Sequence, residues 1–216
     1  NLKTHNSKYD CIIGISGGKD STRQALWVKN KLKMNPLLIC CSYPPKQMEK
    51  IGAKNIENLI LKGFDIHIET PAPETSKNLS LMSFTKFGNV CKSTEMALFS
   101  SVPRIALEKN IKIIFWGENT SIQVGDHETY GENDIDGRNL FKLNTLTDGD
   151  KEWIKDIPSK KRYFYEYPTV KLLKEKKIYT IFLGPLIDNW SNLNNAFFSS
   201  THGLNMRPFD QNETGD

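Results

Sequence analysis

A glycine turn between an apolar run and an amphipathic segment constrains this chain more than any other feature. Residues 11–15 form a short run rich in β-branched side chains, the pattern of a buried strand. Residues 22–33 have the pattern of a helix, and its inner face is expected to carry Ala25, Val28 and Leu32, widened by Leu26. The turn between them, residues 16–21, reads Ser-Gly-Gly-Lys-Asp-Ser. A strand, a glycine turn and a helix aim backbone N–H groups at an anion, so the sequence predicts a phosphate site here.

Apolar runs and helical patterns alternate along most of the remaining chain. Further strands are expected at residues 37–41, 64–69, 111–116 and 179–183. Further helices are expected at residues 48–62, with Ile56, Leu59 and Ile60 inward, and at 75–87, 93–110 and 169–176. Pro103 is expected to kink or split the third of these helices. This alternation predicts an α/β fold: a doubly wound parallel sheet of about five strands.

Length and local composition suggest one main domain with flanking segments. In a chain of 216 residues we expect a lead-in at 1–8 and a nucleotide-binding α/β domain at 9–185. That domain includes a polar, glycine-containing insertion at about 120–160. Residues 186–216 are aromatic and Asn-rich, and we expect them to form a C-terminal extension. Because the chain does not begin with Met, we expect it to be a fragment, with that extension truncated.

Charge and cysteine usage narrow the class of protein. The net charge of +4 is explained as well by a phosphate-rich ligand as by nucleic acid. Without a long Lys/Arg run, a nucleic-acid partner is not expected. Cys11, Cys40 and Cys41 lie in apolar strand patterns and no C-x-x-C pair occurs, which favours a reduced, cytoplasmic protein. No apolar run approaches the roughly 18 residues of a membrane span, so none is expected.

Two common phosphate loops do not fit the turn. A P-loop requires Gly at position 13 and Ser or Thr at position 20, where this chain has Ile13 and Asp20. The dinucleotide fingerprint G-x-G-x-x-G, begun at Gly14, fails at Ser16. The turn therefore belongs to a different phosphate-binding class.

The Ser-Gly-Gly-Lys-Asp-Ser turn resembles the signature of the PP-loop ATP pyrophosphatase superfamily, with its adenine nucleotide alpha hydrolase-like fold. ATP would be the substrate, bound through Ser16, Gly17, Gly18, Lys19, Asp20 and Ser21. The two glycines allow close approach of the backbone to phosphate oxygens, and the serine hydroxyls add donors. Lys19 would offset charge on the pyrophosphate, and Asp20 would hold Mg²⁺ that bridges it to the nucleotide. Attack would occur at the α-phosphorus, which releases pyrophosphate and leaves AMP.

Later segments resemble one branch of that superfamily, the N-acetyl sugar amidotransferases of surface-polysaccharide biosynthesis, such as those acting on pseudaminic acid. They occur in the expected order at residues 9–13, 35–37, 55–59, 63–65, 116–118, 167–169 and 181–184. The resemblance covers residues 9–207. It implies conversion of an acetamido group to an acetamidino group in LPS, O-antigen or flagellin-glycan synthesis, with ammonia from a separate glutaminase subunit. The chain lacks the branch's cysteine-rich segment before the loop, and of its C-x-x-C pair it keeps Cys91 alone.

Other polar residues follow predicted strands or lie in the polar stretch. Glu118 is expected to hold Mg²⁺ or steer ammonia, and joins Lys19 and Asp20 as a catalytic candidate; the alternative is a solvated turn. Ser42, Tyr43 and Gly117 are candidates for the adenine side of the site. Cys91 and His127 are candidate substrate or loop residues, against the simpler interpretation that both are solvated. Arg23 is a candidate phosphate ligand, while Trp190, Phe197 and Phe198 fit either a subunit contact in a homo-oligomer or the core.

Two alternatives to an amidotransferase stay open at this stage. One is another PP-loop enzyme, such as a tRNA-modifying thiolase or ligase, which would favour paired thiols or a basic RNA-binding face. The other is a nucleotide-binding protein of the same fold without turnover.

Overall fold

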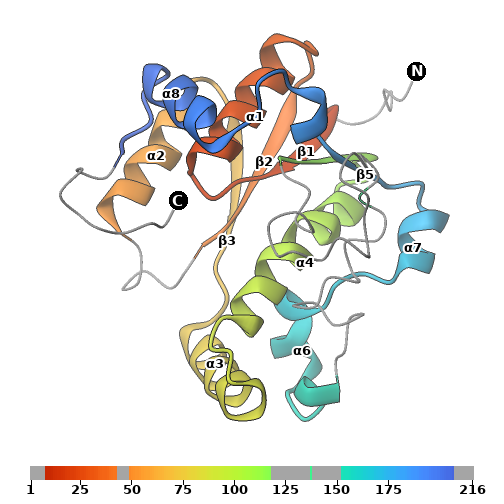
Figure 1. The fold of residues 1–216 in the computed structure, drawn as a ribbon. Coiled ribbons are helices and arrows are strands. Elements are labelled where there is room, and N and C mark those ends of the chain that lie inside the picture. The colour runs from red at the N-terminus through yellow and green to blue at the C-terminus, as the bar shows by residue number, and fades with distance from the viewer. Residues whose placement is uncertain (1–7, 43–48, 118–136, 138–151, 207–216) are drawn as a thin grey trace.

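A five-stranded, fully parallel sheet forms the centre of the computed structural model, which describes residues 8–42, 49–117, 137 and 152–206 (Figure 1). The strand order is β3-β2-β1-β4-β5. The strands are β1 (Cys11–Gly14), β2 (Pro36–Cys41), β3 (Asp65–Glu69), β4 (Ile113–Trp116) and β5 (Tyr179–Phe182). The predicted fold class is confirmed.

Helices cover both faces of this sheet (Figure 1). They are α1 (Lys19–Asn30), α2 (Lys50–Leu61), α3 (Pro73–Phe87), α4 (Lys92–Glu108), α6 (Ser159–Arg162), α7 (Val170–Glu175) and α8 (Asn192–Thr201). Short 3₁₀ turns lie at Glu152–Ile154, Tyr163–Tyr165 and Gly184–Leu186. No helix among the described residues is both long and apolar enough to cross a membrane.

In β1, β2 and β4, alternate side chains pack into two separate cores, one on each face of the sheet. Ile12 and Ile114 point into the layer with α3, α4 and α7, whereas Ile13 and Phe115 point into the layer with α1 and α2. All four side chains are at most 5% exposed. Burial on both sides explains why these strands are continuous apolar runs rather than alternating ones.

The structure corrects three details of the predicted helices. Leu32 is 40% exposed because α1 ends at Asn30, so Leu32 lies beyond the helical stripe. Ile60 is 51% exposed: Leu59 is fully buried, and Ile60 lies about 100° further round the last turn of α2. Pro103 does not split α4, which is continuous from Lys92 to Glu108; the buried Val102, Pro103 and Ile105 hold this stretch against the sheet.

The C-terminal part of the chain forms a helix that the sequence pattern did not reveal. Helix α8 packs on α1, and both lie on the same side of the sheet as α2 (Figure 1). Asn55 and Asn58 of α2 also bond to the chain just after α8, since their amides donate to the backbone carbonyls of Asn205 and His202. The domain boundaries expected from the sequence stay a prediction.

Candidate nucleotide-binding site

The glycine turn lies where the strand order reverses. From β1 the chain passes outward to β2 and β3, and it then returns to the other side of β1 to form β4 and β5. In open parallel sheets, ligands bind in the crevice outside the carboxyl ends of the two strands at such a switch point. Here those ends are Gly14, followed by the glycine turn, and Trp116, followed by Gly117.

The backbone of the turn has the geometry that its glycines predict. The Ile15 N–H donates to the Ile39 carbonyl at 2.8 Å, which extends the β1–β2 pairing into the turn. Gly17 has φ +81°, a left-handed conformation that disfavours any residue with a Cβ. Gly18 is the N-cap of α1, and no described side chain caps this helix. The positive end of a 12-residue helix therefore lies at the switch point with no side-chain cap from the described residues.

Lys19 and Asp20 lie together in the first turn of α1. Lys19 Nζ is 3.0 Å from Asp20 Oδ2, and the two side chains are 13% and 22% exposed. The Ser16 hydroxyl accepts from the Gly18 N–H at 3.3 Å, and the Ser21 hydroxyl donates to the Gly18 carbonyl at 3.2 Å. The predicted ligand residues thus form one compact turn, and the roles of Ser16 and Ser21 as phosphate donors stay predictions.

A magnesium ion fits the donor chemistry of this turn only in company with a nucleotide. Asp20 supplies a carboxylate, the hard oxygen ligand that Mg²⁺ prefers. The described part of the chain holds no group of three or more His, Cys, Asp or Glu side chains able to bind a metal. The other oxygen ligands of the ion would therefore have to come from nucleotide phosphates and water, as they do where Mg²⁺ binds together with a nucleotide.

Ser42 and Gly117 directly follow β2 and β4 and so lie at the carboxyl edge of the sheet, and their role on the adenine side stays a prediction. Ser42 is 9% exposed, and its N–H donates to the Glu69 carbonyl at 2.8 Å. A Cβ on Gly117 would lie 3.0 Å from Gln24 Oε1, so α1 approaches this backbone closely. Gln24 is 1% exposed, and its Nε2 has no hydrogen-bond partner among the described residues, which places a buried donor at the switch point. Tyr43, Glu118 and His127 lie outside the described residues.

Cys91 is not brought to the glycine turn. It is the exposed N-cap residue of α4, where its N–H donates to Asn89 Oδ1 at 2.8 Å. Figure 1 separates the α3–α4 junction from α1. The other three cysteines lie in strands; burial raises the pKa of the Cys40 thiol to about 11 and that of Cys41 to about 12.

Arg23 and α8 form a group of contacts that sequence reasoning missed. Arg23 donates to the carbonyls of Asp188 and Asn189 and to Asn195 Oδ1, and its role as a phosphate ligand stays a prediction. Burial lowers the pKa of this guanidinium. Of the aromatic candidates, Trp190 packs against the core on the α1 side, Phe198 stacks on His202, and Phe197 is 71% exposed.

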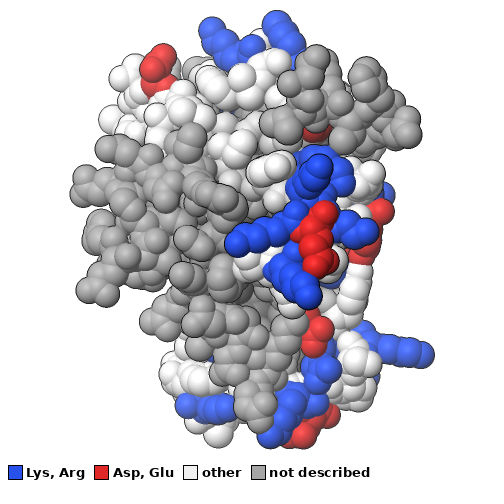
Figure 2. Space-filling view, turned by 90° about the vertical axis from the view of Figure 1, so that its right-hand side faces the viewer, with Lys and Arg blue, Asp and Glu red and all other residues white. Residues whose placement is uncertain are grey.

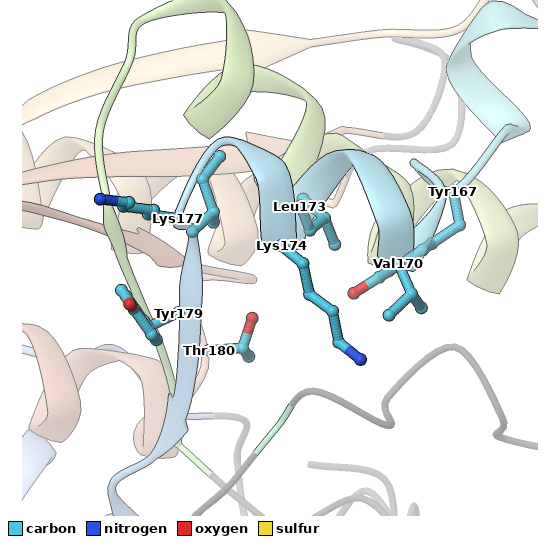
Figure 3. A pocket seen from close by; sticks show the side chains of 8 residues that line it. Tyr167, Val170, Leu173, Lys174, Lys177, Tyr179 and Thr180 are labelled. Atoms are coloured by element: carbon cyan, nitrogen blue, oxygen red, sulfur yellow. The ribbon is translucent and has the colours of Figure 1, made fainter.

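A separate cavity of about 240 Å³ lies at the amino end of β5, whereas the glycine turn lies at the carboxyl end of the sheet (Figure 3). Its wall is formed by α7, the following turn and the start of β5, with Tyr167, Leu173, Lys174 and Thr180 among the lining residues. Gly137 packs directly on Thr180, since a Cβ there would overlap the Thr180 Cγ2 methyl group. The cavity is therefore remote from the glycine turn.

Basic side chains gather on the face that carries α7, with a smaller number of acidic ones among them (Figure 2). Within α7 itself, Lys171 and Glu175 form an exposed ion pair at 3.9 Å. This mixture is typical of a solvated surface.

Comparison with known proteins gives limited similarity. No protein-family model matches the chain. An uncharacterized protein of Methanocaldococcus jannaschii is 42% identical over 59 residues, which is 27% of this chain and 21% of that protein. The match therefore spans about a fifth of that relative's length.

Solved structures with a similar chain course include three synthetases. The glutamine-dependent NAD⁺ synthetase of Acinetobacter baumannii, solved with ADP, is 17% identical with a TM-score of 0.38, over 55% of this chain and 24% of that one. The NH₃-dependent NAD synthetase of Campylobacter jejuni is 16% identical with a TM-score of 0.44, over 80% of this chain and 86% of that one. The NMN synthetase of Francisella tularensis is 14% identical with a TM-score of 0.42, over 95% of this chain and 91% of that one. Likeness at this level carries no argument about function, which has to come from the site.

Proposed function

We propose that this chain is an ATP pyrophosphatase-type enzyme of the PP-loop superfamily, which binds ATP at residues 16–21 and forms AMP and pyrophosphate. The observation that carries the proposal is the placement of Ser-Gly-Gly-Lys-Asp-Ser between β1 and α1, at the switch point of the sheet. Gly17 at φ +81° and the N-terminus of α1, which no described side chain caps, suit an anion there.

The side chains of the turn favour release of pyrophosphate over transfer of the γ-phosphate. In a P-loop, a Ser or Thr after the Lys holds Mg²⁺ between the β- and γ-phosphates. Asp20 occupies that place here, and its carboxylate would repel a bare phosphate. Lys19, 3.0 Å from Asp20, supplies positive charge beside it. Together with the N-terminus of α1, this charge would stabilise pyrophosphate as a leaving group.

Magnesium bound to Asp20 and to phosphate oxygens would neutralise charge on the departing pyrophosphate. The chain's own residues bind and orient the nucleotide: the amides of α1 hold phosphate oxygens, and the edge near Ser42 and Gly117 faces the adenosine end. Their task is to align the α-phosphorus with the incoming oxygen.

We further propose that the acceptor is an N-acetylated sugar. The segments that resemble the N-acetyl sugar amidotransferases support this finer assignment. The acetamido oxygen would attack the α-phosphorus, and the bond to pyrophosphate would break. Ammonia would then add to the activated carbon, and AMP would leave with the former amide oxygen. A neutral amide reacts poorly with ammonia until its oxygen becomes such a leaving group, which explains the need for ATP.

Supply of ammonia by a separate glutaminase subunit belongs to the same proposal. None of the four cysteines is placed as a glutaminase nucleophile: Cys11 and Cys40 are buried in strands, Cys41 is half-buried at the end of β2, and Cys91 caps α4. Free ammonium should therefore replace the partner in a reaction with this chain alone.

Mass spectrometry tests the proposed reaction. The chain is incubated with ATP, Mg²⁺, ammonium and a panel of N-acetylated sugars, both free and nucleotide-linked. Exchange of O for NH lowers the sugar's mass by about one dalton, with AMP and pyrophosphate as coproducts. AMP formation that requires tRNA would instead favour a thiolase or ligase. Nucleotide binding without any product would favour the non-catalytic alternative, and ADP as the product would contradict the mechanism.

A further inference from the structure

Helix α8 buries polar side chains and exposes apolar ones, the reverse of an ordinary amphipathic helix. Asn195 and Ser199 are fully buried, whereas Leu193 is 80% and Phe197 is 71% exposed. Burial of an amide or a hydroxyl is unfavourable unless its hydrogen bonds are made. The buried face of α8 must therefore be explained by what its polar groups contact.

Both buried polar residues contact the first turn of α1. Asn195 Nδ2 donates to Asp20 Oδ1 at 2.5 Å, and the Ser199 hydroxyl donates to the Lys19 carbonyl at 2.6 Å. Asn195 and Ser199 are one helical turn apart and so lie on one face of α8. This face meets the two residues of the glycine turn that carry charge.

The orientation of the Asn195 amide is fixed by Arg23. The guanidinium of Arg23 has donors only, and it donates to Asn195 Oδ1 at 2.5 Å. Asn195 Nδ2 must then face Asp20, which accepts from it. Arg23 is itself held by the carbonyls of Asp188 and Asn189. The chain Arg23–Asn195–Asp20 thus fixes one carboxylate oxygen from a buried position.

We propose that Asn195 is a positioning residue for Asp20. By holding Oδ1, it directs Oδ2, which lies 3.0 Å from Lys19 Nζ, toward the metal and pyrophosphate. This inference rests on the proposed function, in which Asp20 acts through Mg²⁺. It assigns the last described helix of the chain to the nucleotide site, although α8 follows Asp20 by well over half the sequence.

Calorimetry with α,β-methylene-ATP tests this role without the second substrate. The dissociation constant is measured in Mg²⁺ and in EDTA, and the ratio of the two reports the part of the binding that depends on the metal. Asn195→Leu removes the donor to Asp20 at nearly constant volume, and Asn195→Ala removes it without placing a side chain of another shape there. For wild type, the dissociation constant in EDTA should exceed that in Mg²⁺ by more than about tenfold. In both variants this ratio should be at least about fivefold smaller than in wild type.

Ser191→Ala is the matched control. Ser191 is the N-cap of α8, and its hydroxyl accepts from the Asn194 N–H at 3.2 Å. Its loss weakens the same helix without touching Asp20, so the ratio should stay within about twofold of wild type. A ratio unchanged in both Asn195 variants would overturn the positioning role alone. Equal affinity in Mg²⁺ and EDTA for wild type would overturn the proposed metal role of Asp20 itself, and the positioning role with it.

Discussion

Gly14 at the end of β1 packs against the ring of Trp116 at the end of β4. A Cβ on Gly14 would lie 2.8 Å from Trp116 Cζ3 and 3.0 Å from a methyl group of Val102. Phe99 packs on the same indole, with ring centroids 5.6 Å apart. The two strands that flank the switch point are thus joined by an aromatic side chain that leaves room for glycine alone.

Gly14→Ala should therefore destabilise the fold by about 1–3 kcal/mol, because the new methyl group overpacks a rigid part of the core. Urea unfolding measures the change. Gly52→Ala is the control: Gly52 lies in α2 with nothing within 4 Å of a built Cβ, so the same substitution should stabilise by about 0.5–1 kcal/mol. Equal effects at the two sites would show that the contact with Trp116 is unimportant.

Gly17→Ala should weaken nucleotide binding at least about tenfold. Its φ of +81° disfavours a side chain, and the Cβ would also lie 3.3 Å from Ile56 Cδ1. Gly88 is a matched control, since it has φ +66° at the C-cap of α3 with nothing within 4 Å. Both substitutions should lower the free energy of unfolding by about 1–2 kcal/mol, because each places a side chain on a left-handed backbone. In a titration with Mg·ATP, the affinity of Gly88→Ala should stay within about twofold of wild type. An equal loss of affinity in Gly17→Ala and Gly88→Ala would contradict the assignment of the glycine turn as the phosphate site.

Asp20→Asn should reduce AMP formation at least about a hundredfold. The substituted amide oxygen can still accept from Asn195, so the fold should persist while the negative charge for Mg²⁺ is lost. Asp65→Asn is the control, because Asp65 forms an exposed ion pair with Lys8 on the edge strand β3. Rates of AMP release are compared by chromatography. Near-normal turnover in Asp20→Asn would rule out the metal role.

The stability of the fold should decrease as pH rises from about 9 toward 11. Burial raises the pKa of Cys40 to about 11, above its value in the unfolded chain. The folded thiol therefore keeps its proton in a range where the unfolded chain releases it, which favours unfolding as pH rises. Urea midpoints at pH 8.5 and 10.5, roughly bracketing this range, measure the effect. In Cys40→Ala the decrease should be smaller; an unchanged decrease would assign it to other groups.

The sequence predicted the parts of this molecule that carry a local pattern. Apolar strand runs and the glycine turn specify the parallel sheet and the backbone of the turn between β1 and α1, because strand burial and left-handed backbone leave a direct mark on residue type. The outward positions of Leu32 and Ile60 depend on where α1 and α2 end, which helical spacing alone does not determine.

Neither helix α8 nor its contacts with α1 could be predicted from local sequence patterns. Its buried face is polar, so the apolar periodicity that identifies a packed helix is missing from residues 192–201. The hydrogen bond between Asn195 and Asp20 joins residues 175 positions apart. Only the assembled sheet, with α8 packed on α1, brings these side chains together.

An oxygen-18 label in the acetamido group of the substrate tests the central claim most directly. If the amide oxygen attacks the α-phosphorus and leaves with AMP, mass spectrometry should find AMP heavier by about two daltons, together with unlabelled pyrophosphate. Unlabelled AMP would show that water rather than the amide attacks the nucleotide. ADP in place of AMP would contradict the assignment of residues 16–21 as a pyrophosphate-releasing turn.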